Sequence, residues 1–174
     1  FYEISRRLEA GEPLRAAAIF GVIFRPKQNS GIPAMAAVIV VYFLFWNFLS
    51  HMIFALFLGN AVMTNVSSSL AVFLSPEGLM MLGFGTLVGA AFATLLFSLT
   101  VVSLPMLLAR EVDFVTAMLT SVAVVRESPA VMLGWGAIIA VSLFLAMLPG
   151  FLGLFVALPV LGHASWSLYR RAVA

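Results

Sequence analysis

The sequence contains no cysteine, and only 9% of its 174 residues are charged. Without cysteine the chain has no disulfide, no thiolate nucleophile and no cysteine-ligated metal. A soluble domain carries roughly a quarter charged residues, so this chain has too few charges to keep a water-facing surface wetted. Lipid must therefore cover much of the protein. This composition excludes an ordinary soluble domain and a thiol enzyme.

Charge is absent from three long runs of the chain. No Asp, Glu, Lys or Arg occurs from Gln28 to Pro76, from Gly78 to Ala109, or from Ser128 to Tyr169. A helix needs about 20 apolar residues to cross the ~30 Å hydrocarbon core. The first two runs each hold one such helix. The third run is too long for one helix, and the turn dipeptide Pro149-Gly150 divides it. Four transmembrane helices are therefore expected, at residues 32–58, 79–108, 130–148 and 151–169.

All nine Lys and Arg residues lie outside these four spans. They form three groups: Arg6, Arg7, Arg15, Arg25 and Lys27; Arg110 and Arg126; Arg170 and Arg171. Lys and Arg beside a span stay in the cytoplasm, so an even number of crossings separates successive groups. We expect a multi-pass protein of the bacterial inner membrane with both termini cytoplasmic. Basic residues beside spans indicate orientation and contact with lipid head groups, and they do not predict nucleic-acid binding.

Two short segments have the pattern of amphipathic helices in the cytoplasmic interface, at residues 13–25 and 112–126. Each ends near an Arg, and a Pro-containing stretch leads from it into a span. This spacing suggests a parallel internal repeat, in which each half is a surface helix followed by a two-span hairpin. The predicted fold is an all-α membrane protein, with residues 1–174 forming a single integral membrane domain.

Small residues recur every fourth position on the second span, at Gly85, Gly89 and Ala93. Apolar burial does not drive helix association in lipid, so close approach at small residues matters more. This face is expected to pack against another helix of the same chain or against a partner. Packing within the chain is the simpler interpretation.

Few side chains within the spans are candidates for chemistry. His51, His163 and Asn47 are the polar intramembrane candidates. By helical rise the two histidines lie ~10 Å and ~20 Å below the outer surface, so they do not meet as axial ligands of one haem. The spans hold no carboxylate or Lys of the kind that a proton-driven transporter uses. We therefore predict no catalytic residue, no metal site and no cofactor, and we expect each histidine to bond a neighbouring polar group.

Two stretches carry a family resemblance, SLPMLLAREVDFVTAMLTSVAVVRESPAVMLGW and LPVLGHASWSLYR. They resemble a bacterial family of predicted integral membrane proteins of unknown function. The resemblance covers about residues 103–171 and is loose over the first hundred residues. Family members often have a second His after the Trp of the closing motif, where this chain has Ser167. The resemblance implies a multi-span inner-membrane protein with no established activity.

Some members of that family are labelled as oxidase subunit I. A true subunit I needs several His ligands, so this chain, with two histidines at different depths, is not that catalytic subunit. It can still be a companion of such a complex. We predict a non-catalytic accessory or assembly subunit of a larger bacterial inner-membrane complex, of the respiratory, oxidase-associated kind. Its expected partners are the bilayer and other integral membrane subunits. The alternative, motivated by the repeat and by Asn47 and His51, is a small transporter, channel or lipid-handling protein.

Overall fold

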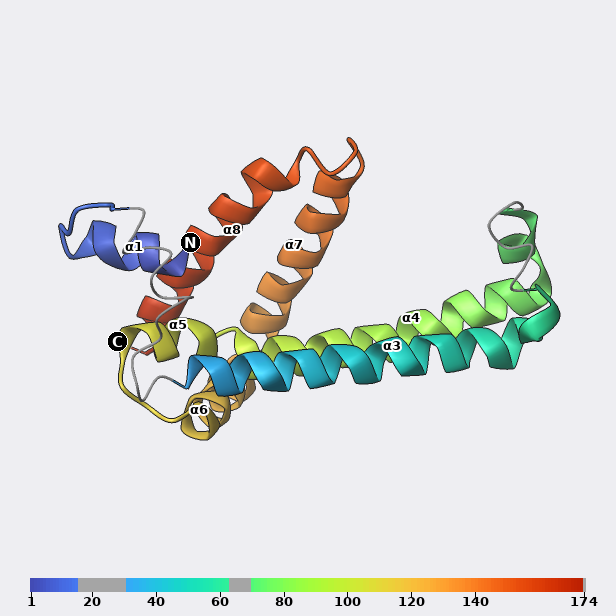
Figure 1. The fold of residues 1–174 in the computed structure, drawn as a ribbon, viewed down its shortest axis with the longest axis horizontal. Helices are drawn as coiled ribbons and strands as arrows, with labels where there is room; N and C mark the ends of the chain where they lie inside the picture. Colours follow the sequence, from blue (N-terminus) through green and yellow to red (C-terminus); the bar gives the residue numbers. More distant parts are fainter. Residues whose placement is uncertain (16–30, 63–69, 174) are drawn as a thin grey trace. The chain divides into compact units, whose positions relative to one another are not determined.

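The computed structural model describes residues 1–15, 31–62 and 70–173, and this part of the chain is helical with no strand (Figure 1). The elements are α1 (Tyr2–Glu9), α3 (Ile32–Val62), the 3₁₀ helix η1 (Leu70–Leu74), α4 (Pro76–Thr100), α5 (Ser103–Ala109), α6 (Phe114–Glu127), α7 (Pro129–Met147) and α8 (Leu154–Ala172). The all-helical class expected from the sequence is confirmed. Most of the surface helix expected at residues 13–25, from residue 16 onward, lies outside the described residues. Its first three expected residues, Pro13–Arg15, are described and are not helical.

Three segments of the described chain are long and apolar enough to cross a membrane: Ile32–Gly59, Pro76–Ala109 and Pro129–Met147. They contain the first two spans expected from the sequence, and the third, at residues 130–148, extends one residue beyond Met147. The fourth expected span corresponds to α8, which starts three residues later than residue 151 and runs through Arg170 and Arg171. That α8 crosses the membrane stays a prediction, and so does the expected number of four transmembrane helices. The internal repeat also stays a prediction.

The second long apolar segment divides into α4 and α5 at Val101–Val102, where a single helix was expected. The cause is Pro105, whose ring clashes with the carbonyl four residues earlier, that of Val101, and which lacks an N–H. The hydroxyl of Ser121 on α6 accepts the N–H of Val102 at 3.1 Å. Ser103 donates its hydroxyl to the carbonyl of Leu99 at 2.6 Å. The break is therefore held by side-chain hydrogen bonds.

Capping residues explain where α4, α6 and α7 begin. The hydroxyl of Ser75 accepts the N–H of Gly78 at 3.1 Å, which caps the first turn of α4. Asp113 caps α6 by accepting the N–H groups of Val115 and Thr116, both at 2.9 Å. Pro129 begins α7, and the residue before a proline is unfavourable for helix, so α6 ends one residue before Ser128.

The contacts divide the chain into two compact units. Unit 1 comprises Phe1–Ala36 and Phe97–Ala174, and unit 2 comprises Ala37–Leu96. In unit 1 the core includes Val102, Ser103 and Ser121, each with no exposed surface. In unit 2 Ile53, Leu58 and Met81 form the buried core. The single membrane domain expected over residues 1–174 stays a prediction.

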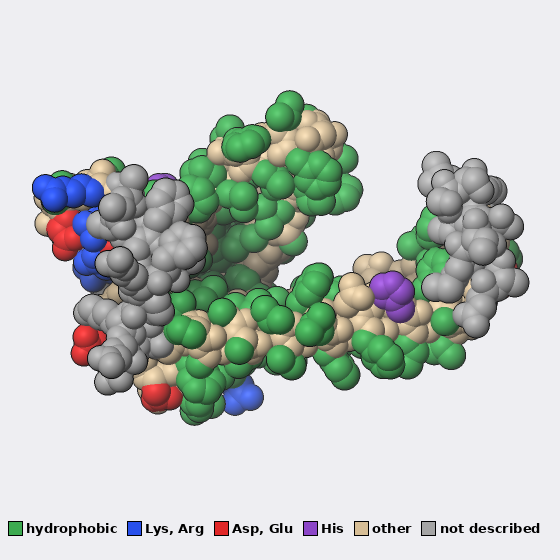
Figure 2. All heavy atoms as spheres, viewed as in Figure 1, with side chains coloured by type: hydrophobic (Ala, Val, Ile, Leu, Met, Phe, Trp, Pro, Cys, Tyr) green, Lys and Arg blue, Asp and Glu red, His purple; other side chains and the backbone are tan. Residues whose placement is uncertain are grey.

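Hydrophobic side chains cover most of the visible surface of α3 and α4, as Figure 2 shows, while charged side chains gather over α1 and near α6. Within Ile32–Gly59, only 6% of the most apolar 18-residue stretch is buried by the chain itself. The surface that remains is suited to lipid or to other apolar helices.

Candidate functional site

The small-residue face of α4 lies against α3 of the same chain. A Cβ atom added to Gly89 would lie 3.1 Å from Cη2 of Trp46, and one added to Gly85 would lie 3.9 Å from the Ile53 side chain. Ala93 lines an apolar groove of about 490 Å³ together with Gly89 and Trp46. The face therefore provides room for the Trp46 indole.

An aromatic cluster surrounds Phe92 in unit 2. The ring centroids of Tyr42, Phe45 and Trp46 lie 5.2, 6.0 and 5.4 Å from that of Phe92. Tyr42 donates its hydroxyl to the backbone carbonyl of Phe92 at 2.6 Å. Aromatic pairs at these separations contribute about 0.5–1.5 kcal/mol beyond their buried area. The sequence analysis did not identify this cluster, although the spacing of Tyr42, Phe45 and Trp46 by three and four residues is its sequence signal.

Asn47 and His51 lie one turn apart on α3. Nδ1 of His51 lies 2.8 Å from the backbone carbonyl of Asn47, and the hydroxyl of Ser50 donates to the same oxygen at 2.8 Å. His51 is exposed. These contacts attach the polar atoms of Ser50 and His51 to the backbone of their own helix.

His163 on α8 contacts the N-terminal helix α1, which the sequence analysis did not predict. Its Nδ1 lies 2.5 Å from the hydroxyl of Ser5. The ring centroid of Phe1 lies 6.5 Å from that of His163, in an edge-on arrangement. The sequence predicts only that His163 bonds a polar group, and the structure identifies that group as the hydroxyl of Ser5.

Aromatic and hydroxyl side chains bury the contact between α1 and α8. Trp166 and Tyr169 are each 2% exposed, and Ser165 beside them is buried. The Tyr2 ring lies 6.5 Å from Trp166, and the Tyr2 hydroxyl bonds Ser165. Burial raises the pKa of Tyr2, and the bond to Ser165 partly offsets this effect.

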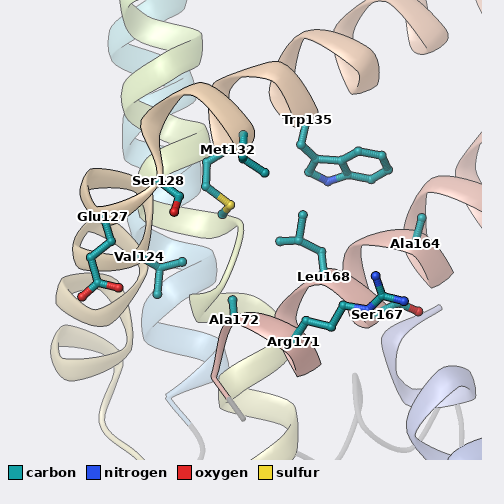
Figure 3. A pocket seen from close by; sticks show the side chains of 11 residues that line it. Val124, Glu127, Ser128, Met132, Trp135, Ala164, Ser167, Leu168, Arg171 and Ala172 are labelled. Carbon is teal, nitrogen blue, oxygen red and sulfur yellow. The ribbon is translucent and has the colours of Figure 1, made fainter.

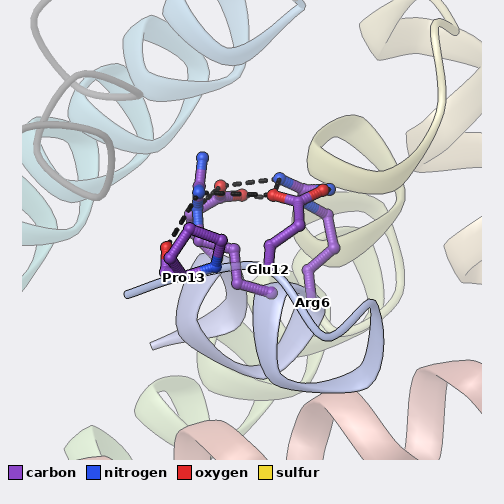
Figure 4. Close-up of polar contacts among 5 residues, drawn as sticks. Arg6, Glu12 and Pro13 are labelled. Carbon is purple, nitrogen blue, oxygen red and sulfur yellow. Dashed lines mark hydrogen bonds and ion pairs between the residues drawn. The ribbon is translucent and has the colours of Figure 1, made fainter. Parts of the chain in front are cut away.

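A carboxylate–guanidinium cluster stabilises α1 (Figure 4). Glu3 accepts from Nη2 of Arg6 at 2.8 Å and from Nε of Arg7 at 2.7 Å, and both arginines also pair with Glu12. The hydrogen bond from Arg6 is the main reason that the pKa of Glu3 is lowered, while burial opposes it and Arg7 adds to it. The spacing of Glu3, Arg6 and Arg7 by three and four residues is the sequence signal for this helix.

The ends of three helices meet at one end of unit 1. Nε of Arg170, on the last turn of α8, lies 3.4 Å from Oε2 of Glu9 at the end of α1. Nη2 of Arg110, just after α5, donates to the carbonyl of Val173 at 3.3 Å. These contacts bring basic residues from all three sequence groups to the same place, since Arg6 and Arg7 lie on α1.

Within the described ranges, no group of three or more His, Asp and Glu side chains is placed to hold a metal ion. The two membrane histidines belong to different units, with His51 in unit 2 and His163 in unit 1. The contacts of Ser50, His51 and His163 therefore join a side chain to its own helix backbone or one helix to another, and they do not bring a set of reactive groups together.

Comparison with known proteins supports a membrane assignment. A family model described as "Predicted integral membrane protein (DUF2189)" matches residues 1–109. The chain belongs to this family. No curated protein and no solved structure shows significant similarity to the chain. The function of DUF2189 is unknown, so the family assignment identifies an integral membrane protein and does not name an activity.

The DUF2189 match lies in a different part of the chain from the resemblance seen in the sequence. That resemblance was based on residues 103–171 and was considered loose over the first hundred residues, whereas the family model covers residues 1–109. The family is confirmed. The expected region overlaps the match only at residues 103–109, which form α5, and the resemblance beyond residue 109 stays a prediction. The match contains α1, so the arginine cluster on Glu3 lies within it.

Proposed function

We propose that this DUF2189 protein is a non-catalytic accessory or assembly subunit of a larger bacterial inner-membrane complex, with a respiratory, oxidase-associated complex as the first candidate. The resemblance to proteins labelled as oxidase subunits motivates that candidate. The protein's polar groups support a structural role, because His163, Glu3 and Tyr2 bond other helices or neighbouring arginines. In this proposal the chain supplies packing surfaces, and the partners supply the chemistry.

The main support for this proposal is an exposed apolar face of α3. Val41, Leu44, Phe48 and Leu56 are 66%, 60%, 67% and 72% exposed. Their spacing of three, four and eight residues places them in one stripe along the helix. On the other side of α3, Trp46 and Ile53 already pack within unit 2. The stripe is a continuous apolar and aromatic surface that an apolar helix of another subunit can cover.

The proposed topology has both termini in the cytoplasm. Arg110 after α5 and Arg170 at the end of α8 both belong to the group of helix ends that meet in unit 1. If α7 crosses the bilayer, α8 must bring the chain back to the side where Arg110 lies. This argument supports four crossings and agrees with the rule that basic residues remain in the cytoplasm.

Photocrosslinking tests the proposed partner face. A photoreactive amino acid at Phe48 should crosslink to another membrane protein in cells, and mild detergent should extract the chain as part of a larger complex. The control position is Trp46, which packs on Gly89 and should crosslink only within the chain. A partner-free monomer whose Phe48 probe captures only lipid would overturn the proposal.

The alternative function is a small transporter, channel or lipid-handling protein. Polar side chains on α3 motivated it, but the Ser50 hydroxyl and Nδ1 of His51 bond the carbonyl of Asn47 on their own helix. The lipid-handling version has separate support from a cavity in unit 1, described below. Purified protein in liposomes would decide between the classes: solute flux that His51→Ala abolishes would favour a transporter over an accessory subunit.

A further inference from the structure

A cavity of about 670 Å³ lies in unit 1 between the end of α6, the start of α7 and the last turns of α8. Its walls are mainly apolar and include Val124, Val131, Met132 and Leu168. Figure 3 shows the Trp135 indole extending from α7 into the space beside α8. The volume falls within the ~300–1,000 Å³ range of pockets that hold small molecules.

Two hydrogen-bond donors of this cavity are not engaged by the described protein. Nε1 of Trp135 is buried and has no hydrogen-bond partner among the described residues. Arg171 lines the same cavity and makes no ion pair with any described residue, in contrast to its neighbour Arg170, which pairs with Glu9. A buried N–H without a partner is unfavourable, and an acceptor on a ligand can remove that cost.

Neither Glu127 nor Ser167, which also line the cavity, engages these donors. Glu127 also lines the cavity, but Figure 3 shows its carboxylate turned away from the other labelled side chains. The hydroxyl of Ser167 donates to the carbonyl of His163 at 3.1 Å and is therefore already engaged. Arg171 and Trp135 thus offer a cationic group and an indole N–H to an anionic acceptor.

The position of the cavity indicates what kind of anion fits it. Its apolar wall comes from the first turns of α7, a helix long and apolar enough to cross a membrane, and Arg171 lies in the last turn of α8. One ligand would therefore meet hydrocarbon-like walls and a guanidinium together. Basic pockets between helices at the cytoplasmic membrane surface are typical sites for acidic lipid head groups.

We propose that this cavity binds an acidic phospholipid, with its phosphate at Arg171 and Nε1 of Trp135 and its acyl chain along Val131 and Met132. The site lies entirely within unit 1, so it does not depend on the partner face of α3 in unit 2. It goes beyond the accessory-subunit proposal, and either proposal can fail without the other.

Native mass spectrometry of the purified full chain tests this site. The protein is mixed with phosphatidylglycerol or phosphatidylcholine, and retained lipid is counted. We expect selective retention of phosphatidylglycerol and about a fivefold loss of that retention in Arg171→Gln, as expected for one basic side chain at an acidic lipid surface. Trp135→Phe, which keeps an aromatic ring but removes the N–H, should also reduce retention.

Arg170→Gln is the matched control, because it removes the same charge one residue away from the cavity. It should leave phosphatidylglycerol retention unchanged. Equal losses in Arg170→Gln and Arg171→Gln would indicate nonspecific surface charge and overturn the proposal, as would equal retention of both lipids. Inorganic phosphate should not displace the lipid; displacement by phosphate alone would identify a small-anion site and also refute it. Each variant is first checked for an unchanged size-exclusion profile.

Discussion

The imidazole Nδ1 of His163 and the hydroxyl of Ser5 lie 2.5 Å apart although 158 positions separate the two residues in the chain. This bond joins α1 to α8, and the buried Trp166 and Tyr169 lie on the same part of α8. The N-terminal helix is therefore part of the folded core of unit 1, and several measurable consequences follow from the contacts that hold it there.

Ser5→Ala should loosen the attachment of α1. The substitution removes the partner of His163, and one such hydrogen bond contributes about 1 kcal/mol. Limited proteolysis in detergent should cleave the α1 region of the variant several-fold faster than that of the unaltered protein. Thr120→Ala is the control, because its hydroxyl donates to the Thr116 carbonyl within α6. Equal cleavage rates in Ser5→Ala and Thr120→Ala would contradict the role assigned to Ser5.

Gly89→Leu should destabilise the α3–α4 pair. Even a single Cβ there lies 3.1 Å from the Trp46 indole, so a larger side chain must displace it. Overpacking of this kind typically costs about 1–3 kcal/mol. The loss of the monodisperse size-exclusion peak after heating measures the effect. Gly83→Leu provides the comparison, since nothing lies within 4 Å of an added Cβ at Gly83. If both variants lose the peak at the same temperature, the Gly89 contact does not stabilise the pair.

Attachment of α1 should weaken in acid. The pKa of Glu3 is lowered from its ordinary value of 4.5, chiefly by the hydrogen bond from Arg6. The unfolded segment therefore binds a proton at a higher pH than the folded one. The stabilisation is fully present above the ordinary value and is lost as the pH falls through the lowered pKa.

Hydrogen exchange of the α1 amides measures this pH dependence. Protection should fall as the pH is lowered below the ordinary carboxyl range, and Glu3→Gln should weaken protection at neutral pH and flatten the profile. The other charged groups near Glu3 are Arg6 and Arg7, which donate hydrogen bonds to it, and Glu12, which pairs with both arginines. Asp113→Asn controls for general acid effects, because Asp113 caps α6 and has a lowered pKa of its own. A profile that Asp113→Asn flattens as much as Glu3→Gln would refute the assignment.

Single cysteines can test the orientation of the helices, because the chain has no cysteine of its own. Cysteine at Arg110 or at Arg126 should react with a membrane-impermeant maleimide only from the cytoplasmic side. Cysteine at Leu152, in the turn between α7 and α8, should react only from the opposite side. Reaction of all three positions from the same side would show that α7 and α8 do not form a spanning hairpin.

The ends of several helices could be predicted from sequence because local chemistry sets them. Asp113 and Pro129 mark the beginnings of α6 and α7 through hydrogen bonding and a fixed backbone angle. The long charge-free runs likewise located the apolar helices. Pro105 lies near the end of the second expected span, but the break that it causes lies four residues earlier, at the carbonyl with which its ring clashes.

The attachment of α1 could not be predicted from sequence, since it depends on partners far along the chain. Ser5 and Tyr2 give no sign of their bonds to His163 and Ser165 until α8 is placed beside them. The same holds for Gly89, whose spacing indicated a packing face while the structure supplies Trp46 as the group that fills it. Small residues reveal that space exists, but the shape of the neighbour decides what occupies it.

The hydroxyl of Ser121 links α6 to the break between α4 and α5, because it accepts the otherwise free amide of Val102. Both residues are completely enclosed, so water cannot replace that bond at low cost. This buried bond therefore couples the position of α6 to the backbone at Val102. Any ligand or protein that displaced α6 would therefore also leave an enclosed amide without its acceptor at the start of α5.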